Sequence, residues 1–218
     1  MSLDLSSQEL RAQAAQTMRN GLSADLHLTG RHVVLEPMQL SHVEQLGAAA
    51  ADGELWKLRF TSVPDPEAMD EYLSRAIMER DNGNFLPFVV RRLSDDKIVG
   101  TTSYYRISTT NLNLSIGYTW YSASVHRTAI NTECKYLLLN HAFEVLGCNA
   151  VMWHTHHDNV RSQAAIKRIG AKFDGVLRAD QILADGSIRD TYCYSMLRTE
   201  WPDSKAFLAN RLGDGDLS

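Results

Sequence analysis

The central third of the chain holds three consecutive stretches of strand character, joined by turns too short to contain a helix. The stretches 85–93, 98–107 and 112–121 are rich in β-branched and aromatic residues, and short polar segments at 94–96 and 109–111 separate them. Consecutive strands with such short connections pair as antiparallel hairpins. Any fold of this chain must therefore accommodate an antiparallel meander.

Helical and extended patterns alternate on both sides of this meander. The further strands are expected at 32–36, 150–156, 176–183 and 188–197, and the helices at 41–56, 66–80, 131–146 and 159–169. The last two strands form a hairpin, because Asp185-Gly186 is a strong two-residue turn. The order predicts an α/β (α+β) fold with a mixed, mostly antiparallel sheet of six to seven strands, flanked by about four helices.

The length of 218 residues favours one domain with tails over two full domains. We expect a helical extension at 1–28, one domain at 29–202 and a flexible tail at 203–218.

The extension resembles an isolated helix over 6–20. Ser6 and Glu9 have the spacing of a capping box, and apolar Leu10, Ala14 and Met18 recur every fourth residue. This apolar stripe is thin, so the helix is expected to dock on the domain or on a second copy of the chain, which makes a homodimer the expected assembly.

Charge and cysteine content exclude several classes of protein. The net charge is −4, which argues against nucleic-acid and anionic-membrane partners. The three cysteines are an odd number without CxxC spacing, as in a reduced protein. The N-terminus has no apolar signal segment, so a cytoplasmic location is expected.

Several segments, in this order, resemble the GNAT superfamily of N-acetyltransferases. The segments 116–120 and 126–133 are similar to its fourth strand, phosphate loop and third helix, and 159–162 with 169–171 to its next helix. Arg189-Asp190-Thr191 resembles the branch that acetylates ribosomal-protein N-termini (alanine or serine) and small amines. The resemblance covers about residues 31–201 and rests on the order and spacing of the segments.

The resemblance implies acetyl-CoA as co-substrate. A loop that enters a helix N-terminus offers backbone N–H groups to a pyrophosphate, and Glu133 is expected to complement that helix start when no ligand is bound. The implied cofactor-binding residues are Trp120, Tyr121, Arg127, Thr128, Ala129, Ile130, Asn131, Thr132, Asn159 and Ser162. The alternatives are an ordinary capped loop, core packing for Trp120 and N-capping for Asn159. Most relatives have glycine at the position of Ala129, where a positive φ would be strained.

The candidate catalytic residues are Ser162, Tyr118 and Asp180. The resemblance places Ser162 near the thioester sulfur, while its alternative role is to satisfy backbone donors in the first turn of a helix. Tyr118, His156 and Asp180 are candidates for the acceptor side. Ser115 stands where many relatives have a glutamate, and Ile166 where a tyrosine acid is common.

The run 154–158 contains three histidines and an aspartate, but we expect no metal. His154 and His156 share one face of the expected strand and His157 points the other way. Two histidines and one carboxylate do not define a site without further ligands.

These features predict transfer of an acetyl group from acetyl-CoA to a primary amine by direct attack, with a small molecule or a protein N-terminus as acceptor. None of the cysteines lies at an expected loop mouth beside a base, which disfavours a covalent enzyme intermediate. The alternative is a non-catalytic acyl-CoA-binding or protein-interaction module on the same fold. A third reading is an unrelated mixed-sheet domain that binds another nucleotide.

Overall fold

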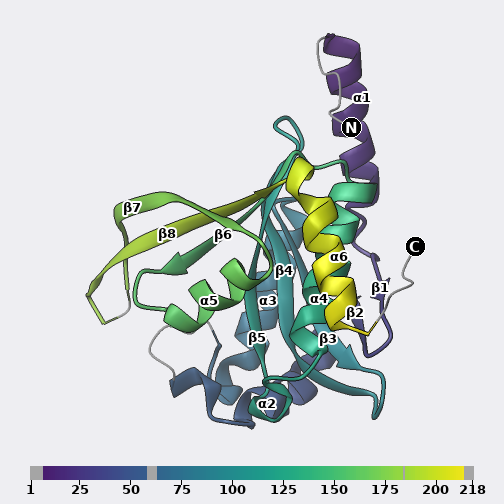
Figure 1. The fold of residues 1–218 in the computed structure, drawn as a ribbon. Helices are drawn as coiled ribbons and strands as arrows, with labels where there is room; N and C mark the ends of the chain where they lie inside the picture. The colour runs from purple at the N-terminus through teal and green to yellow at the C-terminus, as the bar shows by residue number, and fades with distance from the viewer. Residues whose placement is uncertain (1–6, 58–62, 184, 214–218) are drawn as a thin grey trace.

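The computed structural model describes residues 7–57, 63–183 and 185–213, and one eight-stranded sheet runs through it (Figure 1). The strands are β1 (Leu28–Thr29), β2 (Val33–Pro37), β3 (Phe85–Arg92), β4 (Lys97–Ser108), β5 (Asn113–Tyr121), β6 (Ala150–His156), β7 (Lys172–Ile182) and β8 (Ile188–Leu197). The α-helices are α1 (Gln8–Gly21), α2 (Val43–Ala51), α3 (Met69–Asp81), α4 (Ile130–Asn140), α5 (Val160–Arg168) and α6 (Trp201–Arg211). The predicted fold class is confirmed, with the two-residue β1 as an additional strand.

The strand order is β1-β2-β3-β4-β5-β6-β8-β7. The predicted meander is present, because β3, β4 and β5 pair antiparallel in sequence order. In the described part of the sheet only β5 and β6 pair in parallel, and α4 forms the crossover between them. A parallel neighbour requires such a crossover, which explains why the helix follows the meander directly.

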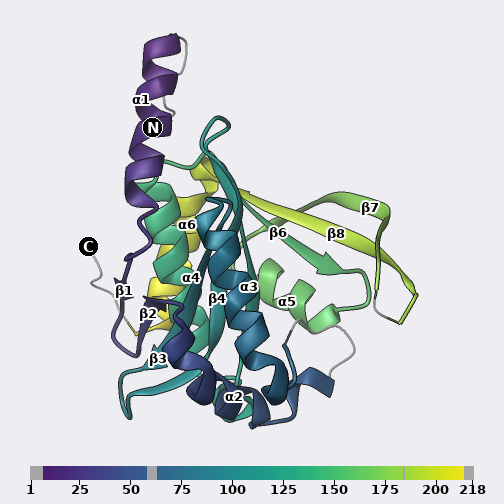
Figure 2. The ribbon, with the colours of Figure 1, turned by 180° about the vertical axis from the view of Figure 1, so that it is seen from behind.

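The sheet separates two hydrophobic cores. Helices α4 and α6 cover one face and α2 and α3 the other, as the two opposite views show (Figures 1 and 2). The main core contains Leu114 and Ile116 of β5 together with Leu138 of α4. The second core contains Trp120 of β5 and Leu73 of α3.

Helix α1 extends beyond the sheet at its N-terminal end (Figure 2). Its N-cap is Ser7, whose Oγ accepts from the Leu10 N–H at 3.2 Å, whereas the predicted cap Ser6 lies outside the described residues. Met18 is fully buried in the main core, but Leu10 is 41% exposed. The helix therefore docks on its own domain through its C-terminal half, and the homodimer stays a prediction.

The prediction of a flexible tail from residue 203 is wrong as far as residue 211, because helix α6 occupies this segment. Leu208 is buried in the main core, and the Trp201 indole donates to Glu144 Oε1 at 2.9 Å. Pro202 lies at the start of this helix, where its missing N–H costs nothing.

The helix expected over 131–146 changes character part-way. It is α-helical to Asn140 and continues as one π-helical turn, His141–Val145. The wider turn changes the direction of its side chains, and Val145 at its end is 50% exposed.

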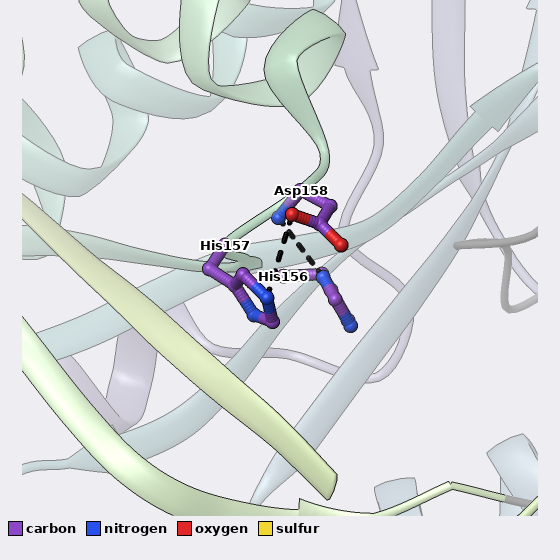
Figure 3. A group of neighbouring side chains, drawn as sticks. All are labelled: His156, His157 and Asp158. Atoms are coloured by element: carbon purple, nitrogen blue, oxygen red, sulfur yellow. Dashed lines mark hydrogen bonds and ion pairs between the residues drawn. The ribbon is translucent and has the colours of Figure 1, made fainter. Parts of the chain in front are cut away.

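Strand β6 ends at His156, so its alternation does not extend to His157. The His156 and His157 rings stack with centroids 4.3 Å apart, which corrects the prediction that they point in opposite directions (Figure 3). His156 Nδ1 accepts from the Asp158 N–H at 3.0 Å, and His157 Nε2 lies 3.4 Å from Asp158 Oδ1. Potential ligand atoms of these three residues lie within 4.8 Å of one another. His156 is buried, and its Nδ1 is bonded within the turn; its place at an acceptor site stays a prediction.

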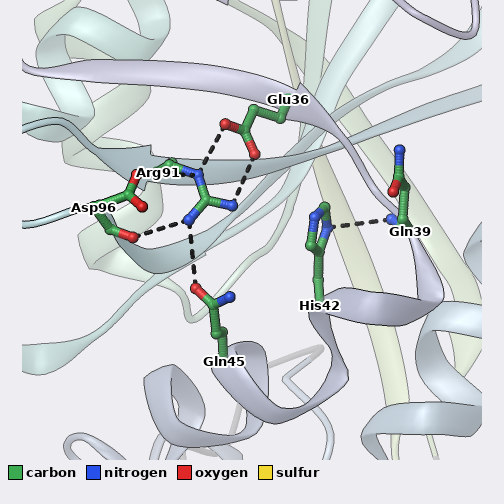
Figure 4. A network of polar contacts seen from close by, with 6 residues as sticks. All are labelled: Glu36, Gln39, His42, Gln45, Arg91 and Asp96. Atoms are coloured by element: carbon green, nitrogen blue, oxygen red, sulfur yellow. Dashed lines mark hydrogen bonds and ion pairs between the residues drawn. The ribbon is translucent and has the colours of Figure 1, made fainter.

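A partly buried ion pair joins β2 and β3 to α2 (Figure 4). The Arg91 guanidinium donates to both oxygens of Glu36, at 2.8 and 3.0 Å, and to Gln45 Oε1 at 3.4 Å. The two charged side chains are only 16% and 20% exposed. Such a bidentate pair holds its partners in one geometry.

No helix among the described residues is long and apolar enough to cross a membrane.

Candidate active site

The sheet opens between β5 and β6. Their parallel pairing covers three residue pairs and ends where Ser115 faces Met152. From Ile116 to Tyr121, β5 continues beside β4, while β6 continues beside β8 to His156. In this part of the described sheet, the facing backbone groups of β5 and β6 are not joined.

A bulge in β5 lies beside this opening. Tyr118 has φ +50° and the β4–β5 register shifts next to it. Ile116 and Trp120 would share a face in a regular strand, but the extra residue turns them to opposite cores. Trp120 thus packs in the second core, away from α4. This is the core-packing role that was the alternative to cofactor binding. Tyr121 packs on the main core, and burial raises the pKa of its hydroxyl well above the ordinary range.

The loop after β5 leads directly into α4. Ala129 is the N-cap, with φ −66° and no side-chain hydrogen bond to the helix. A positive φ would have strained Ala129, but its φ is negative and this strain is absent. The residue of the loop with a left-handed backbone is Arg127, with φ +63°. The Thr128 hydroxyl donates to the Val125 carbonyl at 2.7 Å. The Thr128 Oγ1 atom also accepts from the Ile130 N–H at 3.4 Å, a long bond that an anion at the helix start can replace.

Glu133, in the first turn of α4, does not complement the helix start as the sequence suggested. Its carboxylate accepts the backbone N–H groups of Arg31, His32 and Val33 at 2.7, 2.8 and 2.9 Å. Gly30 permits this approach, since a Cβ there would lie 2.5 Å from the Glu133 carboxyl carbon. Glu133 thus fixes the backbone at the start of β2. Its carboxylate does not bond to the first N–H groups of α4, where the positive end of the helix dipole lies.

A hollow of about 370 Å³ borders the same loop on its β2–β3 side. Arg31, His32 and Arg92 contribute basic side chains to it, and Thr128 and Ala129 form part of its wall. Arg92 is held by Asp95 through two bonds, at 2.7 and 2.6 Å.

Helix α5 begins on the β6 side of the opening. Asn159 is its N-cap, and Asn159 Oδ1 accepts from the Ser162 N–H at 3.0 Å. Asn159 therefore caps the helix, which is the structural alternative that the sequence offered for it. Ser162 lies partly buried in the first turn.

The remaining predicted residues lie on the face of the sheet that carries α2 and α3. Tyr118 is 45% exposed and packs edge-on against Phe85 and Tyr105, with centroids 5.0 and 5.2 Å away. Asp180 lies further along the sheet, where its Oδ2 accepts from the Thr191 hydroxyl at 2.7 Å. Tyr118 and Asp180 thus do not contact each other, and neither belongs to the α4 loop.

A family model described as an acetyltransferase (GNAT) domain matches residues 32–172, which is more than half of the chain. The chain belongs to the GNAT acetyltransferase family. The match contains the opening between β5 and β6, the loop before α4 and the start of α5, so all three are elements of the GNAT domain. A search of curated proteins gave no significant match.

Solved structures of GNAT proteins share the fold. A GCN5-related N-acetyltransferase from Brucella melitensis is 29% identical, with a TM-score of 0.75 over 85% of each chain. RimJ of Mycobacterium smegmatis, solved with CoA-disulfide, is 21% identical, with a TM-score of 0.69 over 83% of this chain and 89% of its own. The microcin C7 self-immunity acetyltransferase MccE, solved with acetyl-CoA and AMP, is 20% identical, with a TM-score of 0.67 over 77% and 93%.

The departures from the GNAT pattern have structural explanations in this chain. Ser115 is fully buried between Tyr105 of β4 and Met152 of β6, where a glutamate would place a charge in the sheet. Ile166 is 7% exposed and part of the main core. Neither position can supply an acid or a base.

Two polar groups near the opening escaped the sequence analysis. Tyr105 Oη lies 2.9 Å from His154 Nδ1, and Arg106 Nη1 donates to His154 Nε2 at 3.2 Å. On the other face, the buried Lys135 ammonium donates to Thr119 Oγ1 at 3.0 Å. Burial lowers the pKa of Lys135 to about 8.

The sequence contained only a partial signal for these groups. The alternation along 150–156 placed His154 on one face of its strand. It did not indicate which residue of another strand the His154 side chain would contact. Tyr104 and Tyr105 are adjacent in the chain, and only the structure shows that Tyr104 enters the main core while Tyr105 reaches His154.

Proposed function

We propose that this GNAT protein transfers the acetyl group of acetyl-CoA to a primary amine by direct attack. The acceptor is a small amine or a protein N-terminus. The observation that carries the proposal is the opening between β5 and β6, which lies beside an uncapped helix start.

The opening suits an extended chain with amide groups. The β5 backbone from Ile116 to Tyr121 has no β6 partner in the described sheet, so a pantetheine arm can bond to it as an added strand does. RimJ and MccE, which share the fold, were solved with CoA-disulfide and with acetyl-CoA.

The loop at 127–132 suits a pyrophosphate. The uncapped first turn of the eleven-residue α4 offers backbone N–H groups and the positive end of the helix dipole. Arg127 is exposed next to it and can add charge-assisted bonds. Together, Arg127, Thr128, Ala129, Ile130, Asn131 and Thr132 would hold the phosphates. The bound thioester supplies the activated acetyl group, and the protein supplies its position and the environment of the amine.

The first test is calorimetric titration with acetyl-CoA, with ATP and NAD as control ligands. We expect saturable binding of acetyl-CoA alone. The Arg127→Ala variant should weaken this binding about tenfold, since a charge-assisted bond contributes roughly 1.5 kcal/mol. The matched control is Arg75→Ala, which removes an exposed arginine paired with Glu71 on α3.

The second test measures release of the CoA thiol with Ellman's reagent. The acceptor panel contains peptides with N-terminal alanine or serine, spermidine and free amino acids. Acetylation of any amine of the panel supports the transferase. Binding without turnover of any of them would favour the non-catalytic acyl-CoA-binding module, and absence of binding would overturn the proposal.

A further inference from the structure

Residues of three adjacent strands converge where β5 and β6 separate. Tyr105 of β4 faces Ser115 of β5, and Ser115 faces Met152 of β6. His154 lies two residues beyond Met152 and so projects from the same face of the sheet. This is the face opposite α4, because the intervening Trp153 is buried in the main core.

The ring of Tyr105 crosses β5 to reach His154. It passes over Gly117, where a Cβ would lie 2.7 Å from the Tyr105 Cε1 atom. A glycine on β5 is therefore what allows the bond of 2.9 Å between Tyr105 Oη and His154 Nδ1. The contact lies at the first residues of the opening and not at the periphery of the sheet.

Arg106 approaches the same imidazole from outside. Adjacent strand residues normally point to opposite faces, but Arg106 has φ +49° within an irregular part of the β4–β5 pairing. Its side chain therefore turns back to His154 Nε2, at 3.2 Å.

These two contacts define the protonation of His154. A guanidinium only donates, so Nε2 must accept and must carry no proton. The proton of the neutral ring then lies on Nδ1, which donates to Tyr105 Oη. Burial lowers the pKa of His154, and the charged groups that face it are, from β4, β7 and β8, Arg106, Asp180, Arg189 and Asp174. The two arginines lower this pKa further, and the two aspartates oppose them.

We propose that His154 is the general base of the reaction, with Nε2 as the proton-accepting atom and Tyr105 as the positioning residue that orients the ring. The inference rests on the proposed function, because it requires an amine acceptor at the opening. In the absence of an acceptor, the Arg106 guanidinium donates to Nε2. When the amine binds, it replaces the guanidinium as the hydrogen-bond partner of Nε2. Its exposed, flexible side chain makes this exchange easy.

The step balances as follows. The acceptor ammonium gives one proton to Nε2, and the free amine attacks the thioester carbonyl carbon. A C–N bond forms and the C–S bond breaks, with its electron pair going to sulfur. The nitrogen loses a second proton, the thiolate takes one up, and His154 releases its proton to water. The sum is one acetamide, one CoA thiol and one released proton.

The test compares His154→Gln with wild type, with the panel amine that wild type acetylates fastest as the probe. We expect kcat to fall about 100-fold or more, which is typical for loss of a general base. The acetyl-CoA affinity should stay unchanged. The matched control is His27→Gln, because His27 is exposed on the segment before β1. Added imidazole should restore part of the lost rate to His154→Gln and none to the control.

The pH profile separates a base from a structural histidine. In wild type, kcat/KM should fall below the pKa of His154, whereas His154→Gln should lose this limb. Arg106→Gln should move the limb to higher pH, since removal of a nearby positive charge raises the pKa of the imidazole.

A variant that keeps the histidine tests the positioning role. Tyr105→Phe should lower kcat less than His154→Gln does and leave KM for acetyl-CoA unchanged. Nitrogen NMR of the histidine rings provides a measurement without any acceptor. We expect His154 to be protonated on Nδ1 and to titrate below 6.5.

The outcomes distinguish the two proposals. A wild type that acetylates no amine of the panel would end the proposed function, and the base assignment with it. An active wild type with an equally active His154→Gln variant would overturn the base assignment alone. A ring protonated on Nε2 would also overturn it.

Discussion

Replacing Lys135 by methionine should make this protein more stable at neutral pH. The Lys135 side chain is 9% exposed, and its ammonium donates to the Thr119 hydroxyl. Burial disfavours the charged form and lowers the pKa of Lys135 from 10.5 to about 8.

The difference of roughly 2.5 pKa units corresponds to about 3 kcal/mol of unfolding free energy. Below pH 8 the lysine is charged in both the folded and the unfolded chain, so the whole penalty is present. As the pH rises from 8 to 10.5, the folded protein releases the proton before the unfolded chain does, and stability increases.

Lys135→Met removes this penalty and one hydrogen bond. The Thr119 hydroxyl keeps the Thr102 hydroxyl as its partner at 2.8 Å, so the loss is about 1 kcal/mol. The net gain at pH 7 is about 2 kcal/mol, which raises Tm by roughly 4–8 °C in a chain of this size.

The assay is urea unfolding of wild type, Lys135→Met and the exposed control Lys97→Met at pH 7 and pH 9.5. The advantage of Lys135→Met should shrink by about 2 kcal/mol at the higher pH, since the wild-type lysine is then largely neutral when folded. An advantage of the same size at both pH values would refute the argument from burial.

Three further variants test other contacts. Glu133→Ala leaves three backbone N–H groups without their acceptor and should cost about 3 kcal/mol or more in urea unfolding; a loss below 1 kcal/mol would show that the 31–33 segment rearranges freely. Glu36→Gln breaks the charge pair with Arg91 and should cost about 1–3 kcal/mol by the same assay, an effect absent if the pair were exposed. Ser162→Ala should bind acetyl-CoA normally and turn over amines at least about tenfold more slowly, and an unchanged rate would remove Ser162 from the reaction.

Local patterns predicted the elements that local energetics determine. The meander followed from β-branched stretches and short turns, and the last hairpin followed from Asp185-Gly186, where Gly186 has a positive φ of 80°. The segment 203–211 was predicted to be flexible, but it forms most of α6, which is held by the burial of Leu208 in the main core.

The site was less predictable, because it depends on contacts distant in sequence. Glu133 meets the backbone at 31–33, about 100 residues earlier, and no local pattern contains that information. The bulge at Tyr118 changes which residues share a face, so the sequence left both the opening and a core open for Trp120, which lies in a core. Whether Ala129 is strained depended on the sign of its φ, which the sequence does not give; the φ is −66°, and the left-handed residue of the loop is Arg127.

The brief contact between β5 and β6 also divides the sheet into two units of different local stability. Three parallel residue pairs join β1–β5 to β6, β8 and β7, with the packing of α6 on α4 as a second link. The outer strand β7 has mostly exposed side chains. Local opening should therefore begin at β7, whose amides should exchange with deuterium faster than those of β3–β5, whereas Tyr194 and Met196 hold β8 in the main core. The outer C-terminal strand is thus expected to have a lower local stability than the meander.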